Sequence, residues 1–450
     1  MNSATRMTEG SISGQMFRFM LPLFIGNLFQ QLYNTADALI VGRLLGEQAL
    51  AAVAGTGNLI FLIVSFFSGI AGGAGVAISR YYGGKEPEKL QSAIHTSVAF
   101  GLIATAVLTV AGVLFSPAML RWMDTPEDIM AQSVEYMAIY FAGSVSLVMY
   151  NTFRGVMQAV GDSKNPLIYL ITSSVINVIL DIVFIKYLYA GVGSAAVATV
   201  IAQLISALLC MRNLLRADEE YRLRIRRIGI DWKMMKLILR YGVPTGLQYS
   251  VIAVANVVVQ ANINAFGTMA VAGCGAYNKV EGFVFVPVDS FGLTMSTFIS
   301  QNLGAGLKER AKKGAAFGMF WMVLLCEIVG VITFIWAPEL ISAFVSDPEA
   351  LAFGVARTRT SVLFYFLMAI TNSFSWILRG AGKAVAPMVV ILASWCVLRV
   401  TILEVAVPIF QSINVVYWVY PITWAVTAIF LTPYFFKADW INGFERNREE

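Results

Sequence analysis

Twelve long apolar segments run through this chain of 450 residues, and they constrain its fold more than any other feature. A helix needs about 20 mainly apolar residues to cross the hydrocarbon core of a bilayer. The segments lie at residues 15–41, 48–79, 92–116, 131–154, 165–187, 191–211, 237–264, 269–303, 314–337, 351–378, 387–409 and 413–436. They lack the alternation over about ten residues that is typical of barrel strands. The sequence therefore predicts an all-α membrane protein with twelve transmembrane helices.

Composition excludes a soluble protein built from several domains. Hydrophobic residues make up 58% of the chain and charged residues only 13%, whereas soluble domains have about 45–50% and 25%. The net charge of +5 is small for this length, so we expect no nucleic-acid partner. The four cysteines lie in apolar stretches without CxxC spacing, and we expect them to be buried rather than metal ligands.

The basic residues predict the orientation in the membrane. If both termini are cytoplasmic, 25 of the 32 Lys and Arg residues lie on the cytoplasmic side or at the cytoplasmic ends of spans, and two, Lys279 and Arg399, lie deeper within spans. The remaining five lie on the outer side or at the outer ends of spans, and they are Arg43, Arg121, Lys186, Arg357 and Arg359. Positive charge accumulates in cytoplasmic loops. We therefore expect a multi-pass protein of the cell membrane with both termini in the cytoplasm.

The chain also repeats itself. Residues 52–57 (AVAGTG) recur as residues 270–275 (AVAGCG), and Gly161 recurs as Gly382, with an offset that stays between 218 and 222. Six helices per copy give both copies the same orientation, so the repeat is parallel. The sequence predicts two pseudo-symmetric six-helix bundles. The lobes comprise residues 1–211 and 237–450, and a charged cytoplasmic linker comprises residues 212–236.

Polar residues within the spans of the first lobe point to an ion site. Asp37, Asp181 and Thr199 lie at a similar depth in the outer half of three helices, and Asn177 lies one turn from Asp181. A charged side chain at the centre of a span costs about 2.5–3.5 kcal/mol, so it needs a partner or a function. Two carboxyls with an amide and a hydroxyl suit a site for H⁺ or Na⁺. Alternatively, each acid satisfies hydrogen bonds in helix packing.

The second lobe does not repeat this chemistry, because Asn177 aligns with Leu398 and Asp181 with Ile402. We therefore expect cation coupling in the first lobe only.

Three polar residues of the second lobe are candidates for a substrate cavity: Tyr277, Glu281 and Arg399. Glu281 could form a second site with Tyr277; alternatively, it forms a neutralising pair with Lys279 or a cluster that faces the mouth of the cavity. Arg399 could cap backbone carbonyls or face a cleft.

The first helix contains a potential hinge. Pro22 lacks the backbone N–H that would continue the helical ladder, and Gly26 follows one turn later, so the helix can bend here. The alternative is a proline in the first turn of the helix, where it causes no bend.

Three motifs resemble a known family. The run at residues 28–42 (LFQQLYNTADALIVG), the NVILD run at 177–181 and the QAVGD corner at 158–162 resemble the multidrug and toxic compound extrusion family, most closely its DinF-like branch. The resemblance covers residues 15–436. It implies export of amphipathic, often cationic drugs and toxic compounds, driven by entry of Na⁺ or H⁺.

The resemblance also implies roles for single residues. Asp37, Asn177, Asp181 and Thr199 match the first-lobe cation site, which would hold Na⁺ in a sodium-coupled member. Gln30, Tyr33, Asn34 and Asn151 fall where the cavity of that lobe is lined, and Pro22 matches a proline whose helix bends. This chain has Gln248 and Asn256 in its seventh helix, where NorM-like members carry an acid, so these two residues join the predicted substrate cavity.

We therefore predict a monomeric antiporter, coupled to Na⁺ or H⁺, that exports such compounds by alternating access. Its partners are an amphipathic small molecule, the coupling cation and membrane lipid. We expect no enzymatic activity and no cofactor. The alternative is a flippase for a lipid-linked oligosaccharide or a related lipid.

Overall fold

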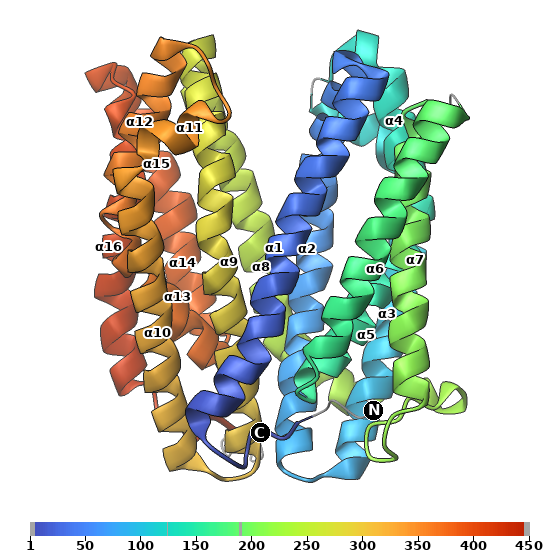
Figure 1. Ribbon diagram of the computed structural model, residues 1–450. Coiled ribbons are helices and arrows are strands. Elements are labelled where there is room, and N and C mark those ends of the chain that lie inside the picture. The colour runs from blue at the N-terminus through green and yellow to red at the C-terminus, as the bar shows by residue number, and fades with distance from the viewer. Residues whose placement is uncertain (1–4, 124, 189–190, 445–450) are drawn as a thin grey trace. The chain divides into compact units, whose positions relative to one another are not determined.

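A computed structural model of the protein describes residues 5–123, 125–188 and 191–444 (Figure 1). It leaves out the side chains of eight helical residues, namely Asn34, Ala36, Ala38, Leu39, Glu47, Leu50, Ala54 and Asn58. Every regular element in the described ranges is a helix. The predicted all-α fold is thus confirmed, and each of the twelve predicted segments falls on one or more helices.

Short connections join the helices of the first half. These helices are α1 (Ile12–Leu45), α2 (Glu47–Gly83), α3 (Pro87–Trp122), α4 (Glu127–Ala142), α5 (Ser144–Ala159), α6 (Lys164–Asp181), the π-helix η1 (Ile182–Tyr187) and α7 (Gly193–Leu215). The predicted linker contains the short 3₁₀ helix η2 (Ile225–Arg227).

The second half repeats this plan with more interruptions. Its helices are α8 (Trp232–Asn264), α9 (Thr268–Gly304), α10 (Lys308–Ile335), α11 (Ala337–Ser342), α12 (Pro348–Val362), α13 (Tyr365–Gly380), α14 (Val385–Ile391), the π-helix η3 (Leu392–Leu398), α15 (Arg399–Phe410) and α16 (Asn414–Lys437).

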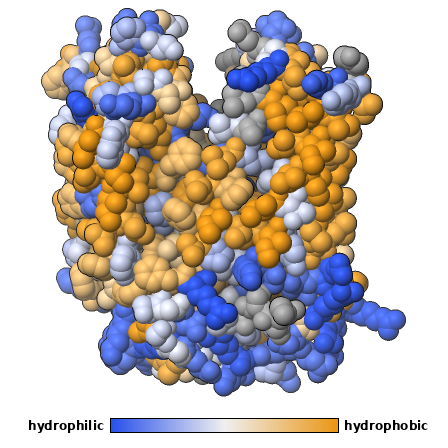
Figure 2. All heavy atoms as spheres, in the orientation of Figure 1, coloured by the Kyte–Doolittle hydropathy of each residue, from blue (hydrophilic) through white to orange (hydrophobic). Residues whose placement is uncertain are grey.

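Many of these helices have the length and polarity of membrane spans. Within the described part of the chain, nine are long and apolar enough to cross a membrane, and a tenth results if α12 and α13, bent by 56°, form one span. On the face drawn in Figure 2, apolar residues cover the middle height of each bundle and hydrophilic residues gather at its lower end. This distribution fits a bilayer around the middle of the helices.

The chain forms two compact units that exchange parts of two helices. Unit 1 consists of Met1–Arg6 and Leu21–Gly246, and unit 2 consists of Met7–Met20 and Leu247–Glu450. The division in α1 falls directly before Pro22, and the division in α8 falls shortly after Pro244. Pro22 lies well inside α1, which begins at Ile12, so the alternative of a first-turn proline is wrong.

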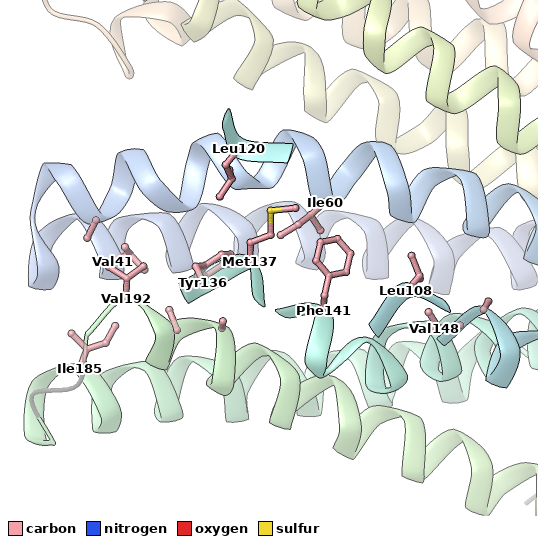
Figure 3. Close-up of a cluster of buried hydrophobic side chains, with 14 residues drawn as sticks. Val41, Ile60, Leu108, Leu120, Tyr136, Met137, Phe141, Val148, Ile185 and Val192 are labelled. Carbon is pink, nitrogen blue, oxygen red and sulfur yellow. The ribbon is translucent and has the colours of Figure 1, made fainter. Parts of the chain in front are cut away.

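Unit 1 has an apolar core and one unusually close helix contact. Figure 3 shows the core, in which Val41, Tyr136, Phe141 and Ile185 lie among other buried side chains.

The close contact joins α2 to the start of α8. A Cβ atom on Gly69 would lie 2.2 Å from the backbone N of Gly246, and one on Gly73 would lie 2.3 Å from the backbone N of Gly242. Only glycine lets two helix backbones approach so closely. These four glycines therefore attach the first part of α8 to unit 1.

In unit 2, the start of α1 packs through side chains instead. The ring of Phe17 makes edge contacts with Phe291 on α9 and with Phe317 and Trp321 on α10, at centroid distances of 5.1–6.0 Å. Aromatic edge contacts at such distances are favourable. The exchanged segment of α1 is thus held by rings, whereas that of α8 is held by backbone contact.

Candidate functional site

Two acidic side chains meet in the interior of unit 1. Asp37 lies on α1 and Asp181 is the last residue of α6, and their carboxyl groups share a hydrogen bond. Asp181 is fully buried. Oδ1 of each carboxyl is also buried, and neither has a hydrogen-bond donor among the described residues. Two ionised carboxylates cannot donate to each other, so this contact requires a proton or another cation.

Three polar residues surround the acid pair. The amide nitrogen of Asn177, oriented as its neighbours require, donates to Oδ2 of Asp181 at 2.9 Å. The amide oxygen of Asn177 accepts from the backbone N–H of Thr199 on α7 at 3.1 Å. The hydroxyl of Tyr33 is hydrogen-bonded to the side chain of Thr199. We call these five residues, Tyr33, Asp37, Asn177, Asp181 and Thr199, the acid site.

Helix periodicity explains why these side chains converge. Tyr33 and Asp37 are four residues apart on α1, and Asn177 and Asp181 are four apart on α6, so each pair lies on one helix face. Directly after Asp181 the chain winds into the π-helix η1. Short π-helical segments occur frequently at functional sites, because they change the direction of the following side chains.

The other residues predicted for the first-lobe cavity are dispersed. Asn151, on α5, lines a mainly apolar pocket between α2, α3 and α5 with a cavity volume of about 40 Å³. Neither Gln30 nor Tyr33 lines this pocket. Gln30 is half-buried on α1, and the side chain of Asn34 is outside the described part of the chain.

The predicted hinge residues line a second pocket in unit 1. Pro22 and Gly26 of α1, with Arg154 of α5 and Leu167 of α6, line a small space of about 20 Å³. This space lies directly beside the proline, where α1 lacks one backbone hydrogen bond.

In unit 2, three of the five predicted cavity residues come together. The hydroxyl of Tyr277 donates to Oε1 of Glu281 at 2.5 Å. The guanidinium of Arg399 stacks on the ring of Tyr420 at 4.3 Å and donates to Oγ1 of Thr423 at 3.0 Å. Arg399 therefore caps a side chain rather than a backbone carbonyl, and the electrostatic field of its guanidinium reaches Glu281.

The other two residues lie elsewhere. The side-chain oxygen of Gln248 accepts from Nη2 of Arg379 at 2.8 Å, at a different position in unit 2. Asn256 is exposed on α8.

One further residue belongs to the cluster around Glu281, and the sequence analysis does not name it as a site residue. The charge count places Arg357 on the outer side of the membrane, but its side chain is only 1% exposed. Its guanidinium lies over the rings of Tyr277 and Tyr420, at 4.5 and 5.2 Å. An arginine inside the apolar segment 351–378 was the signal that we overlooked. We call Tyr277, Glu281, Arg357, Arg399 and Tyr420 the arginine cluster.

A comparison with protein families identifies the family to which the chain belongs. One family model, described as MatE, matches residues 22–183 and again residues 244–403. The chain belongs to the MatE family. The double match is consistent with the internal repeat, and the resemblance drawn from the sequence motifs is confirmed.

Individual relatives of this MatE protein cover most of its length. "Probable multidrug resistance protein YoeA" of Bacillus subtilis is 29% identical over 87% of this chain and 86% of its own length. "FAD transporter" of Shewanella oneidensis is 25% identical over 76% of this chain and 77% of its own. A solved structure, "Outward-facing conformation of a multidrug resistance MATE family transporter of the MOP superfamily", covers 97% of this chain and 98% of its own, with a TM-score of 0.91 and 21% identity.

These similarities support two conclusions about the MatE protein. It is a multi-pass membrane transporter rather than an enzyme, and its two bundles have the fold of solved MATE transporters. Its place in the DinF-like branch stays a prediction.

Proposed function

We propose that this MatE protein is a cation-coupled exporter of amphipathic compounds, and that it works by alternating access. The acid site carries the proposal. Two carboxyl groups lie together inside a membrane protein, and neither forms an ion pair with a basic side chain among the described residues. Carboxyls in such surroundings bind a cation or stay protonated.

The direct contact between the two carboxyl groups favours a proton over sodium. One shared proton satisfies an oxygen of each group and needs no further ligand. A sodium ion would need several oxygen ligands at once. The amide oxygen of Asn177 is already engaged by the backbone of Thr199, and the side chain of Thr199 by Tyr33. We therefore propose H⁺ as the coupling ion, bound by Asp37 and Asp181.

Binding of the proton would act on the position of α1. Asp37 belongs to α1, whereas Asp181 and Thr199 belong to α6 and α7. A proton that binds one arrangement of these helices more tightly shifts the equilibrium towards it. Pro22 and Gly26 would serve as the hinge, since Pro22 removes one backbone hydrogen bond inside α1 and a small pocket lies beside it. By linkage, a change in proton affinity between the two states is coupled to a reciprocal change in substrate affinity.

Several features of this transporter remain predictions. Relatives named for multidrug resistance support amphipathic drugs as substrates. The pocket beside Asn151, together with Gln30 and Asn34, is our candidate for drug contact in the first lobe. We also propose that the two lobes comprise residues 1–211 and 237–450, joined by the linker 212–236. We propose that the protein is a monomer in the cell membrane with both termini in the cytoplasm.

Transport into vesicles tests the proposal directly. The purified protein is reconstituted into proteoliposomes, and movement of rhodamine 123 is followed under an imposed pH gradient without sodium, and then under a sodium gradient at constant pH. We expect transport in the first condition only. Transport that requires sodium and ignores the pH gradient would refute H⁺ coupling. Absence of transport under both gradients would refute the exporter itself.

The flippase alternative makes a different prediction. A lipid-linked oligosaccharide should then raise the thermal unfolding temperature of the purified protein, and rhodamine 123 should not. Because one relative is named FAD transporter, flavin nucleotides should also be tested in the thermal unfolding assay.

A further inference from the structure

We propose that unit 2 contains a binding site for an anionic group, a carboxylate or a phosphate, built on Arg357 and Arg399. The inference rests on the proposed function, because it names a substrate class for the exporter: amphipathic compounds that carry an acidic group. The site lies wholly within unit 2, on α9, α12, α15 and α16 (Figure 1).

The first argument is charge. Arg357 is 1% exposed and Arg399 is 2% exposed. Glu281 is the one acid whose field acts on both guanidiniums, and no ion pair within 4.0 Å joins it to either of them in the described structure. Two buried cations thus face a single carboxylate at a distance. Buried charges are stable when they are paired and hydrogen-bonded, so the cluster lacks one negative charge.

The second argument is the direction of the free N–H groups. Arg357 stacks on Tyr277 and Tyr420, and Arg399 stacks on Tyr420 and Trp395. Stacking occupies the faces of a guanidinium and leaves its edges for acceptors in the same plane.

Only part of each edge is used. Nη2 of Arg357 donates to the hydroxyl of Tyr420 at 3.3 Å, and Nη2 of Arg399 donates to Thr423 at 3.0 Å. Nε and Nη1 of Arg357 and Nε of Arg399 are buried without any acceptor among the described residues. Buried donors nearly always have acceptors, so these three nitrogens point to an acceptor supplied from outside the chain. Carboxylate and phosphate oxygens match guanidinium donors best.

The third argument is access. Glu281 and Tyr420 are partly exposed, whereas Arg357, Arg399 and Tyr277 are buried. The cluster thus has two members that reach the surface of unit 2. The hydroxyl of Tyr277 holds the carboxyl of Glu281 within the cluster, where a negative charge opposes a second anion. Removal of this charge should strengthen anion binding.

A purely structural role for the cluster predicts a different result. If the two arginines only hold four helices together, their replacement lowers the thermal unfolding temperature and changes the affinity for acidic and neutralised ligands equally. Selectivity for the acidic group, rather than affinity or stability, therefore distinguishes the two roles.

Matched pairs of fluorescent ligands measure this selectivity. Rhodamine 110 has a free carboxyl group, and rhodamine 123 is its methyl ester. Flavin mononucleotide carries a phosphate, and riboflavin lacks it. Binding of each to the purified protein is measured by fluorescence anisotropy at constant pH. We expect the wild type to prefer the acidic member of at least one pair by about tenfold, since a charge-assisted hydrogen bond is worth at least that much. The pair that responds identifies the acidic group as carboxylate or phosphate.

Three variants complete the test. Arg357→Gln and Arg399→Gln should each abolish the preference and leave the affinity for rhodamine 123 or riboflavin within about twofold. Arg359→Gln removes the same charge two residues away at an exposed position, and should keep the preference. Glu281→Gln should raise the affinity for the acidic member, and this variant decides the question if the arginine variants do not fold.

The outcomes separate this inference from the proposed function. Equal binding of both members of both pairs by the wild type, or an unchanged preference in Glu281→Gln and both arginine variants, overturns the anionic site. Because binding needs no gradient, a protein that prefers acidic ligands and transports nothing refutes only the exporter. A protein that transports rhodamine 123 and shows no preference refutes only the anionic site.

Discussion

The two units contain opposite charges at their centres. In unit 1 the carboxyls of Asp37 and Asp181 are in contact, and the hydroxyl and amide groups around them are neutral. In unit 2 Arg357 and Arg399 stack on a shared tyrosine, and Glu281 is the nearby acid. One duplicated scaffold thus supports two different electrostatic environments. A repeat in sequence preserves the helices and their packing, but it does not preserve the chemistry between them.

A π-helical segment adjoins the charged residues in both units. In unit 1, η1 begins directly after Asp181, and in unit 2, η3 ends directly before Arg399. A π-helical turn widens the helix and rotates the side chains that follow. The two units therefore share a local change in backbone geometry and differ in the side chains that it positions.

The largest effect should come from neutralising the acid site. Asp37→Asn and Asp181→Asn remove the group that takes up the coupling proton, and we expect each to reduce pH-driven transport of rhodamine 123 by at least about 100-fold, to the level of empty vesicles. The equivalent change in unit 2, Glu281→Gln, should leave this dependence on the pH gradient intact. Initial rates in proteoliposomes measure both effects.

The matched control for the acid site is Asp128→Asn. Asp128 is exposed at the start of α4, so its replacement removes one carboxylate without touching the site. Transport by Asp128→Asn should equal that of the wild type. If Asp37→Asn also transported normally under a pH gradient, the acid site would have no part in coupling, and the contrast between the units would be structural only.

A smaller effect, on stability, should come from disturbing the glycine contact that holds the first part of α8 against α2. Gly73→Ala places a methyl group 2.3 Å from the backbone of Gly242, so α2 and α8 must move apart. We expect the free energy of unfolding to fall by about 1–3 kcal/mol, as in other overpacked interiors. Gly72→Ala, one residue earlier, meets nothing within 4 Å and should be neutral or stabilising by up to about 1 kcal/mol. Thermal unfolding in detergent compares the two; equal unfolding temperatures would exclude the backbone contact.

The sequence predicted best those features that depend on a single local property, such as apolar length or helix periodicity. Twelve apolar segments predicted the helices because only helices and closed barrels satisfy their backbone in a bilayer, and the alternation of barrel strands is missing. Spacing of four residues predicted that Asn177 and Asp181 share a face, and the structure brings both next to Asp37 and Thr199.

Contacts between distant segments could not be predicted in this way. Arg357 follows the apolar run Leu351–Ala356, but the sequence does not show which side chains cover its charge; the aromatic rings over its guanidinium come from α9 and α16. Asn151 was expected near Gln30 and Tyr33, but the pocket that it lines opens between other helices. Local periodicity does not show which distant side chains a residue contacts. It also does not show that α1 and α8 are divided between the two units near their prolines.

The smallest expected effect concerns Asp231, which attaches the linker to unit 1. Its carboxylate accepts from the Ser92 hydroxyl on α3 at 2.7 Å and from the backbone N–H groups of Lys233 and Met234 at the start of α8. These donors, Ser92 foremost, lower the pKa of Asp231. A carboxyl with a lowered pKa stabilises the fold at neutral pH, and this stabilisation is lost as the pH falls from about 4 through the folded-state value.

Asp231→Asn should therefore lower the free energy of unfolding by about 1 kcal/mol or less at pH 7, because the side chain is exposed and solvent screens its charge. The difference from wild type should shrink below about pH 4. Asp218→Asn, in the same linker, serves as the control and should unfold like the wild type at both pH values. Thermal unfolding at pH 7 and pH 3.5 measures this. A difference that grows in acid would mean that Asp231 acts through something other than its ionised carboxylate.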